Sequence, residues 1–152
     1  MTPSSIRITL DSPVAHYQPG DRLTGRFMLE GTQMRQVRSA ELSILWYTTG
    51  KGDKDMAVHH FERLVEDPAK PLDLRVPHRF ATVLPPSPLS YDGTTVKVCW
   101  CVRVRVFQPF VQESVAELPF QLGSVAAADP NAGDMGSKSD DAEMESEPAK
   151  GN

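Results

Sequence analysis

The fold is decided by the stretch Thr95–Phe107, which reads TVKVCWCVRVRVF. Large apolar residues occupy every second position of this stretch, at Val96, Val98, Trp100, Val102, Val104 and Val106. Side chains of an extended strand point alternately to opposite faces, so all six lie on one side. Burial of one aliphatic side chain contributes roughly 1.5–3 kcal/mol before entropy is counted. The stretch therefore predicts a long central β-strand that forms one wall of a core.

Shorter stretches with strand character lie on both sides of this one. Alternating apolar residues predict strands at 6–10, 23–29, 37–49, 56–64, 80–84 and 111–122, the last interrupted at Pro119. Turn signals separate them, namely Pro19-Gly20, the loop 48–55, the proline-rich stretch 85–88 and Asp92-Gly93. Gly25, inside a predicted strand, indicates a bulge or a close backbone approach. With no amphipathic helix in view, we predict an all-β fold, an immunoglobulin-like antiparallel β-sandwich.

Charge and composition divide the chain into two parts. Its 152 residues, 39% of them hydrophobic, suit one domain. Residues 127–152 contain seven acids and two lysines, whereas the rest of the chain contains 14 basic and 13 acidic residues. Beyond residue 124 there is no aromatic side chain, and such a composition buries too little surface to offset its ordering entropy. We predict a sandwich over residues 1–124 and a disordered acidic tail over 125–152.

Several classes of partner and location are disfavoured by composition. Residues 1–126 carry a net charge of +1 and therefore have no electrostatic reason to bind nucleic acid or anionic lipid. No apolar run approaches the roughly 18 residues of a membrane helix, and the N-terminus lacks a signal-peptide core. Cys99 and Cys101 lie two apart on one strand, a spacing that an unstrained disulfide does not favour. We expect a soluble, cytoplasmic protein without stable membrane insertion.

Two segments resemble the arrestin-like N-terminal domain family. Residues 17–25, YQPGDRLTG, resemble the proline-glycine-acid turn and following glycine of the family's first hairpin. Residues 80–93, FATVLPPSPLSYDG, run into Val96–Val106 and resemble the family's strand, proline-rich crossing and long strand. The similarity covers about Ile6 to Leu122 in order and spacing.

The resemblance implies an immunoglobulin-like sandwich that docks other proteins, as in adaptors that bind receptors, sorting cargo or ligases. Arrestins pair two such sandwiches, and this chain is long enough for one, so the inter-domain polar core and the receptor switch are not transferred. Ile6-Arg7-Ile8-Thr9 stands where visual and β-arrestins carry paired phosphate-sensing lysines, so no phosphate site is transferred either. Whether another chain supplies a second domain stays open.

Two groups of residues are candidates for metal or enzyme chemistry. His59 and His60 are adjacent, so in a regular strand they point to opposite faces and cannot jointly chelate a metal. Cys99 and Cys101 share a face, but a zinc site would need His78, His59 or a second chain to complete it. No G-x-S-x-G elbow is present. We predict a non-enzymatic module without a cofactor. The alternatives are a metal-binding or enzymatic domain that uses these histidines and cysteines, and a structural subunit of a larger assembly.

Candidate partner contacts lie on one loop and one strand face. The loop 50–55 lacks the spacing of a phosphate loop or an EF-hand and is typical of an exposed hairpin tip, where binding residues collect. Lys97, Arg103 and Arg105 form a basic row on the face of the long strand opposite its valines. This row either pairs with acids such as Glu41 or contacts an acidic partner, which could be the chain's own tail. An unpaired edge strand offers a further route, to a homodimer or to a partner's strand. The candidate contact residues are Lys51, Asp53, Lys54, Lys97, Arg103 and Arg105.

Overall fold

The structure is a computed structural model that describes residues 5–31, 37–52, 54–69, 72–109, 112–123 and 125–126. Ten strands follow one another along these residues: β1 (Ser5–Leu10), β2 (His16–Tyr17), β3 (Arg22–Glu30), β4 (Ser39–Gly50), β5 (Met56–Val65), β6 (His78–Val83), β7 (Tyr91–Asp92), β8 (Val96–Phe107), β9 (Ser114–Leu122) and β10 (Val125–Ala126). The described residues contain no helix that is long and apolar enough to cross a membrane.

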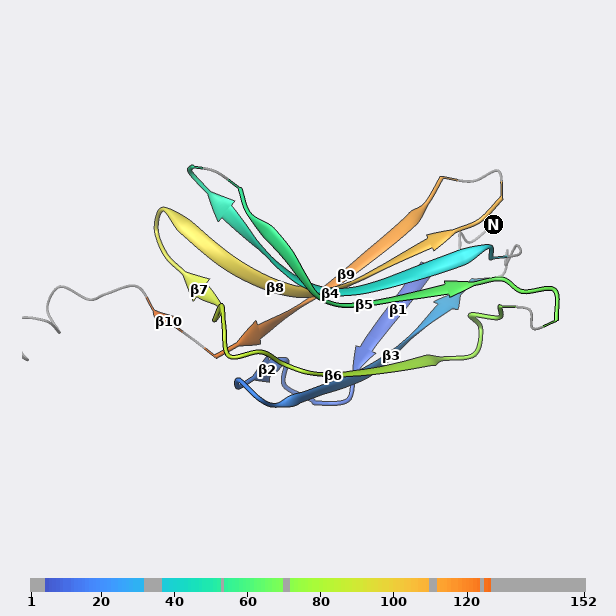
Figure 1. The fold of residues 1–152 in the computed structure, drawn as a ribbon, viewed down its shortest axis with the longest axis horizontal. Helices are drawn as coiled ribbons and strands as arrows, with labels where there is room; N and C mark the ends of the chain where they lie inside the picture. The colour runs from blue at the N-terminus through green and yellow to red at the C-terminus, as the bar shows by residue number, and fades with distance from the viewer. Residues whose placement is uncertain are drawn as a thin grey trace, which may run out of the picture.

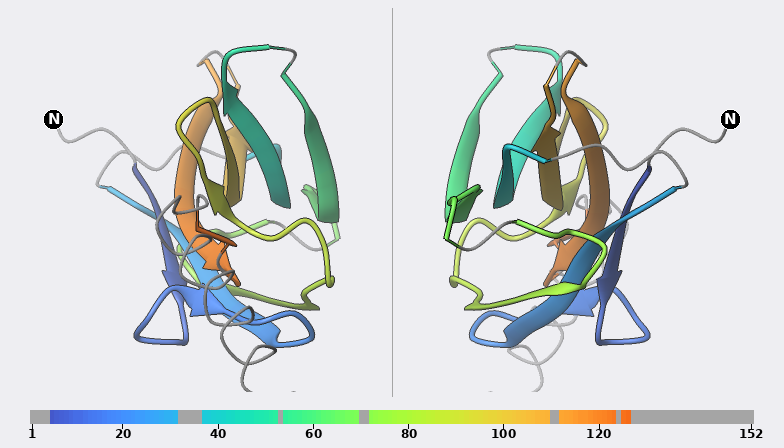
Figure 2. Two further views of the ribbon diagram at one scale, coloured as in Figure 1. Left: turned by 90° about the vertical axis from the view of Figure 1, so that its left-hand side faces the viewer. Right: turned by 90° about the vertical axis from the view of Figure 1, so that its right-hand side faces the viewer.

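The strands form two sheets that pack face to face (Figure 1). The small sheet has the order β1-β3-β6, and the large sheet places β5, β4 and β8 side by side. On its other side β8 pairs with β7 near its start and with β9 along the rest of its length. Figure 2 shows the two layers from their ends, with β5 at the rim of the large sheet. The predicted β-sandwich is confirmed. The prediction did not include two short parallel pairs, β2 with β9 and β10 with β7.

The valine-rich stretch is β8, at the centre of the large sheet. Trp100, Val102, Val104 and Val106 are buried as predicted, whereas Val96 and Val98, close to the strand's start, are half-buried. These side chains join a core that includes Leu42 and Ile44 of β4 and Leu23, Phe27 and Phe80 of the small sheet. The indole Nε1 of Trp100 donates a hydrogen bond to the carbonyl oxygen of Pro88 at 2.8 Å. The proline-rich crossing is thereby tied to the core.

Two local expectations about glycines are confirmed. Gly20 has a φ of 87°, and the Asp21 N–H donates to the Gln18 carbonyl oxygen at 3.0 Å, which closes the proline-glycine turn. At Gly25 a Cβ would lie 2.5 Å from the Thr9 carbonyl oxygen and 2.9 Å from Phe80 Cζ. Glycine is needed there because two neighbouring strands leave no room for a side chain.

Pro119 does not interrupt the last long strand, contrary to expectation. It lies within β9 opposite Cys101 of β8. In the described part of the chain β9 has a second neighbour, β2, only at Gln121 and Leu122. A proline without an N–H is tolerated where the outer side of a strand is unpaired, and the ladder with β8 therefore continues through it.

The boundaries near the end of the sandwich also differ from the predicted ones. Asp92, expected in a turn, pairs with Lys97 as part of β7, and the turn begins at Gly93, whose N–H donates to the Val96 carbonyl oxygen at 3.1 Å. Strand β10 carries the described chain two residues past the predicted boundary at 124. Residues 127–152, which make up most of the predicted acidic tail, lie outside the described residues.

The core assignment predicts a large difference between two truncations. Leu42 has no exposed surface, so Leu42→Ala should lower the free energy of unfolding by about 2–5 kcal/mol by leaving a cavity. Val83 is 60% exposed, and Val83→Ala should change it by less than about 0.5 kcal/mol. Urea unfolding followed by tryptophan fluorescence measures both. Equal losses in the two variants would contradict the assigned core.

Candidate functional site

The outer face of the large sheet, turned away from the small sheet, carries an apolar surface. Directly paired residues of neighbouring strands point to the same side of a sheet. The pairing places Val58 of β5, Leu45 of β4, Cys101 of β8 and Pro119 of β9 in one row across the outer face. A second row contains Met56, Tyr47 and Cys99, and Phe61 belongs to the row on the other side. We call these residues the outer patch: Leu45, Tyr47, Met56, Val58, Phe61, Cys99, Cys101 and Pro119.

The outer patch is partly open to solvent. Met56, Val58 and Phe61 are 55%, 48% and 52% exposed, whereas Leu45 and Cys101 on the same face are only 1% and 2% exposed. The outward face of an antiparallel sheet normally carries polar side chains. In β4 the sequence showed that Leu45 interrupts an otherwise polar face. It did not predict that β5 adds apolar side chains to the same face.

A β-bulge at His59 explains why the patch was missed. Val58 pairs with Leu45 and His60 pairs with Ile44, so His59 is an extra residue without a partner in β4. Val58 and Phe61 are three residues apart and would face opposite sides in a regular strand. The extra residue brings both to the outer face.

Charged side chains border the outer patch. Arg103 lies in the same row as Phe61 and makes an ion pair with Glu117 of β9. The next row carries Glu41, Arg63 and Arg105. These rows give one margin of the apolar surface an alternating pattern of cations and acids.

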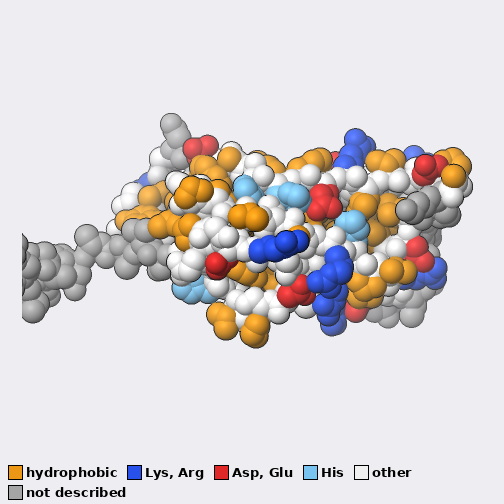
Figure 3. Space-filling model, turned by 60° about the horizontal axis from the view of Figure 1, so that its bottom comes forward, with side chains coloured by type: hydrophobic (Ala, Val, Ile, Leu, Met, Phe, Trp, Pro, Cys, Tyr) orange, Lys and Arg blue, Asp and Glu red, His pale blue; other side chains and the backbone are white. Residues whose placement is uncertain are grey.

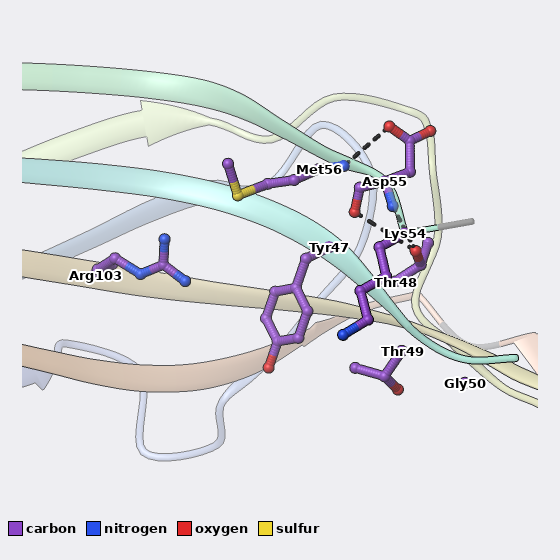
Figure 4. A pocket seen from close by; sticks show the side chains of 8 residues that line it. All are labelled: Tyr47, Thr48, Thr49, Gly50, Lys54, Asp55, Met56 and Arg103. Carbon is purple, nitrogen blue, oxygen red and sulfur yellow. Dashed lines mark hydrogen bonds between the residues drawn. The ribbon is translucent and has the colours of Figure 1, made fainter. Parts of the chain in front are cut away.

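A hollow of about 530 Å³ opens at the other margin, where β4 and β5 approach their hairpin (Figure 4). Its walls combine the apolar parts of Tyr47 and Met56 with the cationic groups of Lys54 and Arg103. The hairpin is held by hydrogen bonds from the Asp55 N–H to Thr48 Oγ1 at 2.8 Å and from the Met56 N–H to Asp55 Oδ1 at 2.9 Å. The hollow thus offers apolar contact beside Lys54, Asp55 and the ion-paired Arg103.

The two cysteines belong to the outer patch and are both free thiols. Burial raises the pKa of the Cys101 thiol to about 11, and the nearby carboxylate of Glu117 adds to the effect. A thiol with this pKa stays protonated at neutral pH and is a poor nucleophile and metal ligand. Cys101 therefore acts as a small apolar side chain.

The histidines lie on the opposite side of β5, where its rim approaches β6 of the small sheet. His59 Nε2 donates to the Val83 carbonyl oxygen at 2.9 Å, and its ring lies against Trp100 with a centroid separation of 6.2 Å. His60 faces the same side, because it pairs with the buried Ile44. The expectation that the two histidines point to opposite faces is wrong, and the bulge is the reason.

Glu62 of β5 joins the two sheets through His78 and is also bonded to His60 of its own strand. Its Oε2 accepts a hydrogen bond from His60 Nε2 at 2.8 Å, and its Oε1 accepts one from His78 Nε2 of β6 at 3.1 Å. Figure 3 shows histidine side chains gathered beside an acidic one on this side of the molecule. Partial burial raises the pKa of Glu62, but the bonds from both histidines outweigh it and the net pKa is lowered. We call this group, with His59, the β5–β6 seam.

Neither candidate group for metal chemistry forms a cluster. The histidines lie in the β5–β6 seam, and the cysteines lie on the outer face. Within the described ranges, no three histidine, cysteine, aspartate or glutamate side chains are arranged to hold a metal ion.

The structure places five of the six candidate contact residues. Lys97, Arg103 and Arg105 share the outer face, opposite Thr49, Ser43 and Glu41 of β4. Lys97 Nζ lies 3.3 Å from Asp92 Oδ1, and Cys99 and Cys101 lie between Lys97 and Arg103 along the strand. The exposed Lys51 and Lys54 belong to the hairpin between β4 and β5, and Asp53 lies outside the described residues. The basic row is therefore a border of the outer patch rather than a continuous cationic surface.

Comparison with known proteins bears on the fold alone. No protein-family model matches the chain, and no curated protein matches it. Among solved structures it is similar to Spo0M, a sporulation control protein from Bacillus subtilis, with a TM-score of 0.58 and 16% sequence identity. The likeness covers 80% of this chain and 50% of that one, so the chain spans about half the length of Spo0M. It supports the arrestin-like sandwich that the two sequence segments indicate.

The burial of Cys101 predicts unequal thiol reactivity. At about pH 8 a thiol reagent should modify at most one cysteine of the native protein, and this should be Cys99, because the Cys101 thiol is buried and protonated. Both should react in denaturant. Mass spectrometry of the modified peptides, with Cys99→Ser as the matched control, measures the difference. Rapid native labelling of Cys101 would contradict its burial within the outer face.

The lowered pKa of Glu62 predicts an acid-dependent contribution to stability. The contribution is complete above the unfolded pKa, near 4.5, and is lost as the pH falls through the lower folded pKa. Glu62→Gln should therefore be less stable than the wild type at about pH 5.5, and this difference should shrink towards pH 3. Thermal unfolding across this range tests it, with the exposed Glu113→Gln as control. A difference that grows on acidification would contradict the assigned bonds.

Proposed function

We propose that the chain is a non-enzymatic arrestin-like module that binds a partner protein through its outer patch. The observation that carries this proposal is the exposure of Met56, Val58 and Phe61 of β5, at 55%, 48% and 52%, on the side of the large sheet away from the core. Monomeric proteins seldom expose large contiguous apolar surfaces, and those that do commonly use them for binding.

The composition of the patch suits a protein interface. Aromatic residues, methionine and arginine are enriched at such interfaces, and Tyr47, Met56, Phe61 and Arg103 supply them here. The ion-paired border and the apolar centre match the usual arrangement of a polar rim around an anchor region. The hollow between Tyr47 and Met56 would receive an apolar side chain of the partner, with the charged Lys54 and Asp55 beside it.

An adaptor or regulatory role is the kind of function that this fold supports. Spo0M, a similar solved structure, is named a sporulation control protein, and we carry over only the idea of a regulatory protein. The partner is expected to be a protein rather than nucleic acid, because the chain outside residues 127–152 is nearly neutral. The cytoplasmic location stays a prediction that rests on the two free cysteines.

Capture of a partner tests the outer patch directly. The immobilised full chain is incubated with lysate of its native cells, and retained proteins are identified by mass spectrometry. Met56→Asp/Val58→Asp should lower retention of the specific partner by about tenfold or more, because charges replace two of the most exposed apolar side chains of the patch.

Val14→Asp/Val76→Asp is the matched control. It introduces the same charges at valines that are 63% and 61% exposed outside the strands. Far-ultraviolet circular dichroism verifies that both variants are folded. Equal retention by the two double variants would exclude the outer patch as the docking surface, and co-purification as a fixed stoichiometric complex would favour the structural-subunit alternative.

A further inference from the structure

The free edges of the two sheets differ in how well they are protected. An edge strand presents unpaired N–H and C=O groups, and natural proteins block them with charges, prolines, bulges or covering segments. In the described chain, β6 is bridged by His59 and Glu62, β9 contains Pro119, and β1 carries Arg7, which is ion-paired with Glu30. The remaining long edge is β5.

Strand β5 carries some of these protections, namely the bulge at His59 and the charged Glu62 and Arg63. Within the described residues it pairs with β4 alone, and it contains neither lysine nor proline. Four of the eight exposed large hydrophobic side chains in the described structure lie on this one strand: Met56, Val58, Phe61 and Val65. The bulge at His59 interrupts the ladder, but residues 60–65 pair with β4 in unbroken register. A regular six-residue edge is therefore available for another strand.

We propose that β5 pairs antiparallel with β5 of a second copy of this chain, with the twofold axis at Phe61. The proposal goes beyond docking on the outer patch, because it uses the backbone edge rather than the sheet face. A second copy suits this edge because β5 is close to electrically neutral, with one glutamate, one arginine and two histidines. A strongly charged partner would find no complementary field along the strand.

The charges select the register. With Phe61 opposite Phe61 of the second copy, the two phenyl rings lie side by side on the outer face. Residues 60–62 of the two copies then pair with one another, and Arg63 comes opposite the bulged His59 of the second copy. Shifting the axis to Glu62 or Arg63 places like charges directly opposite each other, which is unfavourable. Pairing about Phe61 also joins the outer faces of the two large sheets into one surface.

Sedimentation equilibrium of the purified full chain over a wide concentration range tests the pairing. The wild type should form dimers, and Phe61→Arg should raise the dissociation constant by about tenfold or more by placing two cations in contact. Val14→Arg, at a loop valine that is 63% exposed, should leave dimerisation unchanged. Val115→Arg places a charge on the outer face of β9, away from the edge of β5. It should therefore weaken a dimer formed by face-to-face packing and leave a dimer formed by edge pairing intact. A monomer at all concentrations, or a dimer disrupted by Val115→Arg and not by Phe61→Arg, would overturn the proposal.

Cross-linking tests the register in a Cys99→Ser background, with the buried Cys101 retained. Phe61→Cys should form a disulfide-linked dimer on mild oxidation, because paired Cβ atoms lie about 4.5–5.5 Å apart. Arg63→Cys should not, because the two positions would lie four residues apart along the ladder. Efficient cross-linking at position 63 and none at 61 would overturn the axis at Phe61. Partner capture by the outer patch is a separate measurement, so a monomeric result leaves that function standing.

Discussion

The burial of alternate side chains of β8 between the two sheets is the interaction on which the rest of the structure depends. Trp100, Val102 and Val104 are buried, and hydrogen-bonded neighbours hold β8 on both sides. A shift of one residue in this register would turn the valines outward and the charged side chains inward. The same constraint places Cys101 and Arg103 on the outer face, opposite Leu45 and Ser43. The outer patch is thus a consequence of how the core is filled.

The bulge at His59 adapts β5 to two different surroundings. Its extra residue directs His59 and His60 towards the small sheet, where they and Glu62 join the rims of the two layers. It also brings Val58 and Phe61 to the same outer face. One inserted residue therefore produces both the polar seam on one side of the strand and part of the apolar surface on the other.

An apolar sheet face beside an unpaired edge is costly for a protein that has no partner, since both features promote association. In this structure the two features meet in β5, which pairs only with β4 in the described residues. This arrangement is the basis of the binding role proposed above.

The sequence by itself determined the longer strands, the sandwich and the face of β8 that is buried, because alternation with a period of two directly reports which side of a strand meets the core. It also located the turn at Gly20 and the close approach at Gly25, which depend on glycine's lack of a side chain. Only the tertiary structure decided the face to which His59 and His60 point, the hydrogen bond between Glu62 and His78, and the apolar rows across the strands. A bulge is a property of pairing between two strands, and rows depend on register between segments far apart in the chain, so no local pattern in the sequence reports either of them.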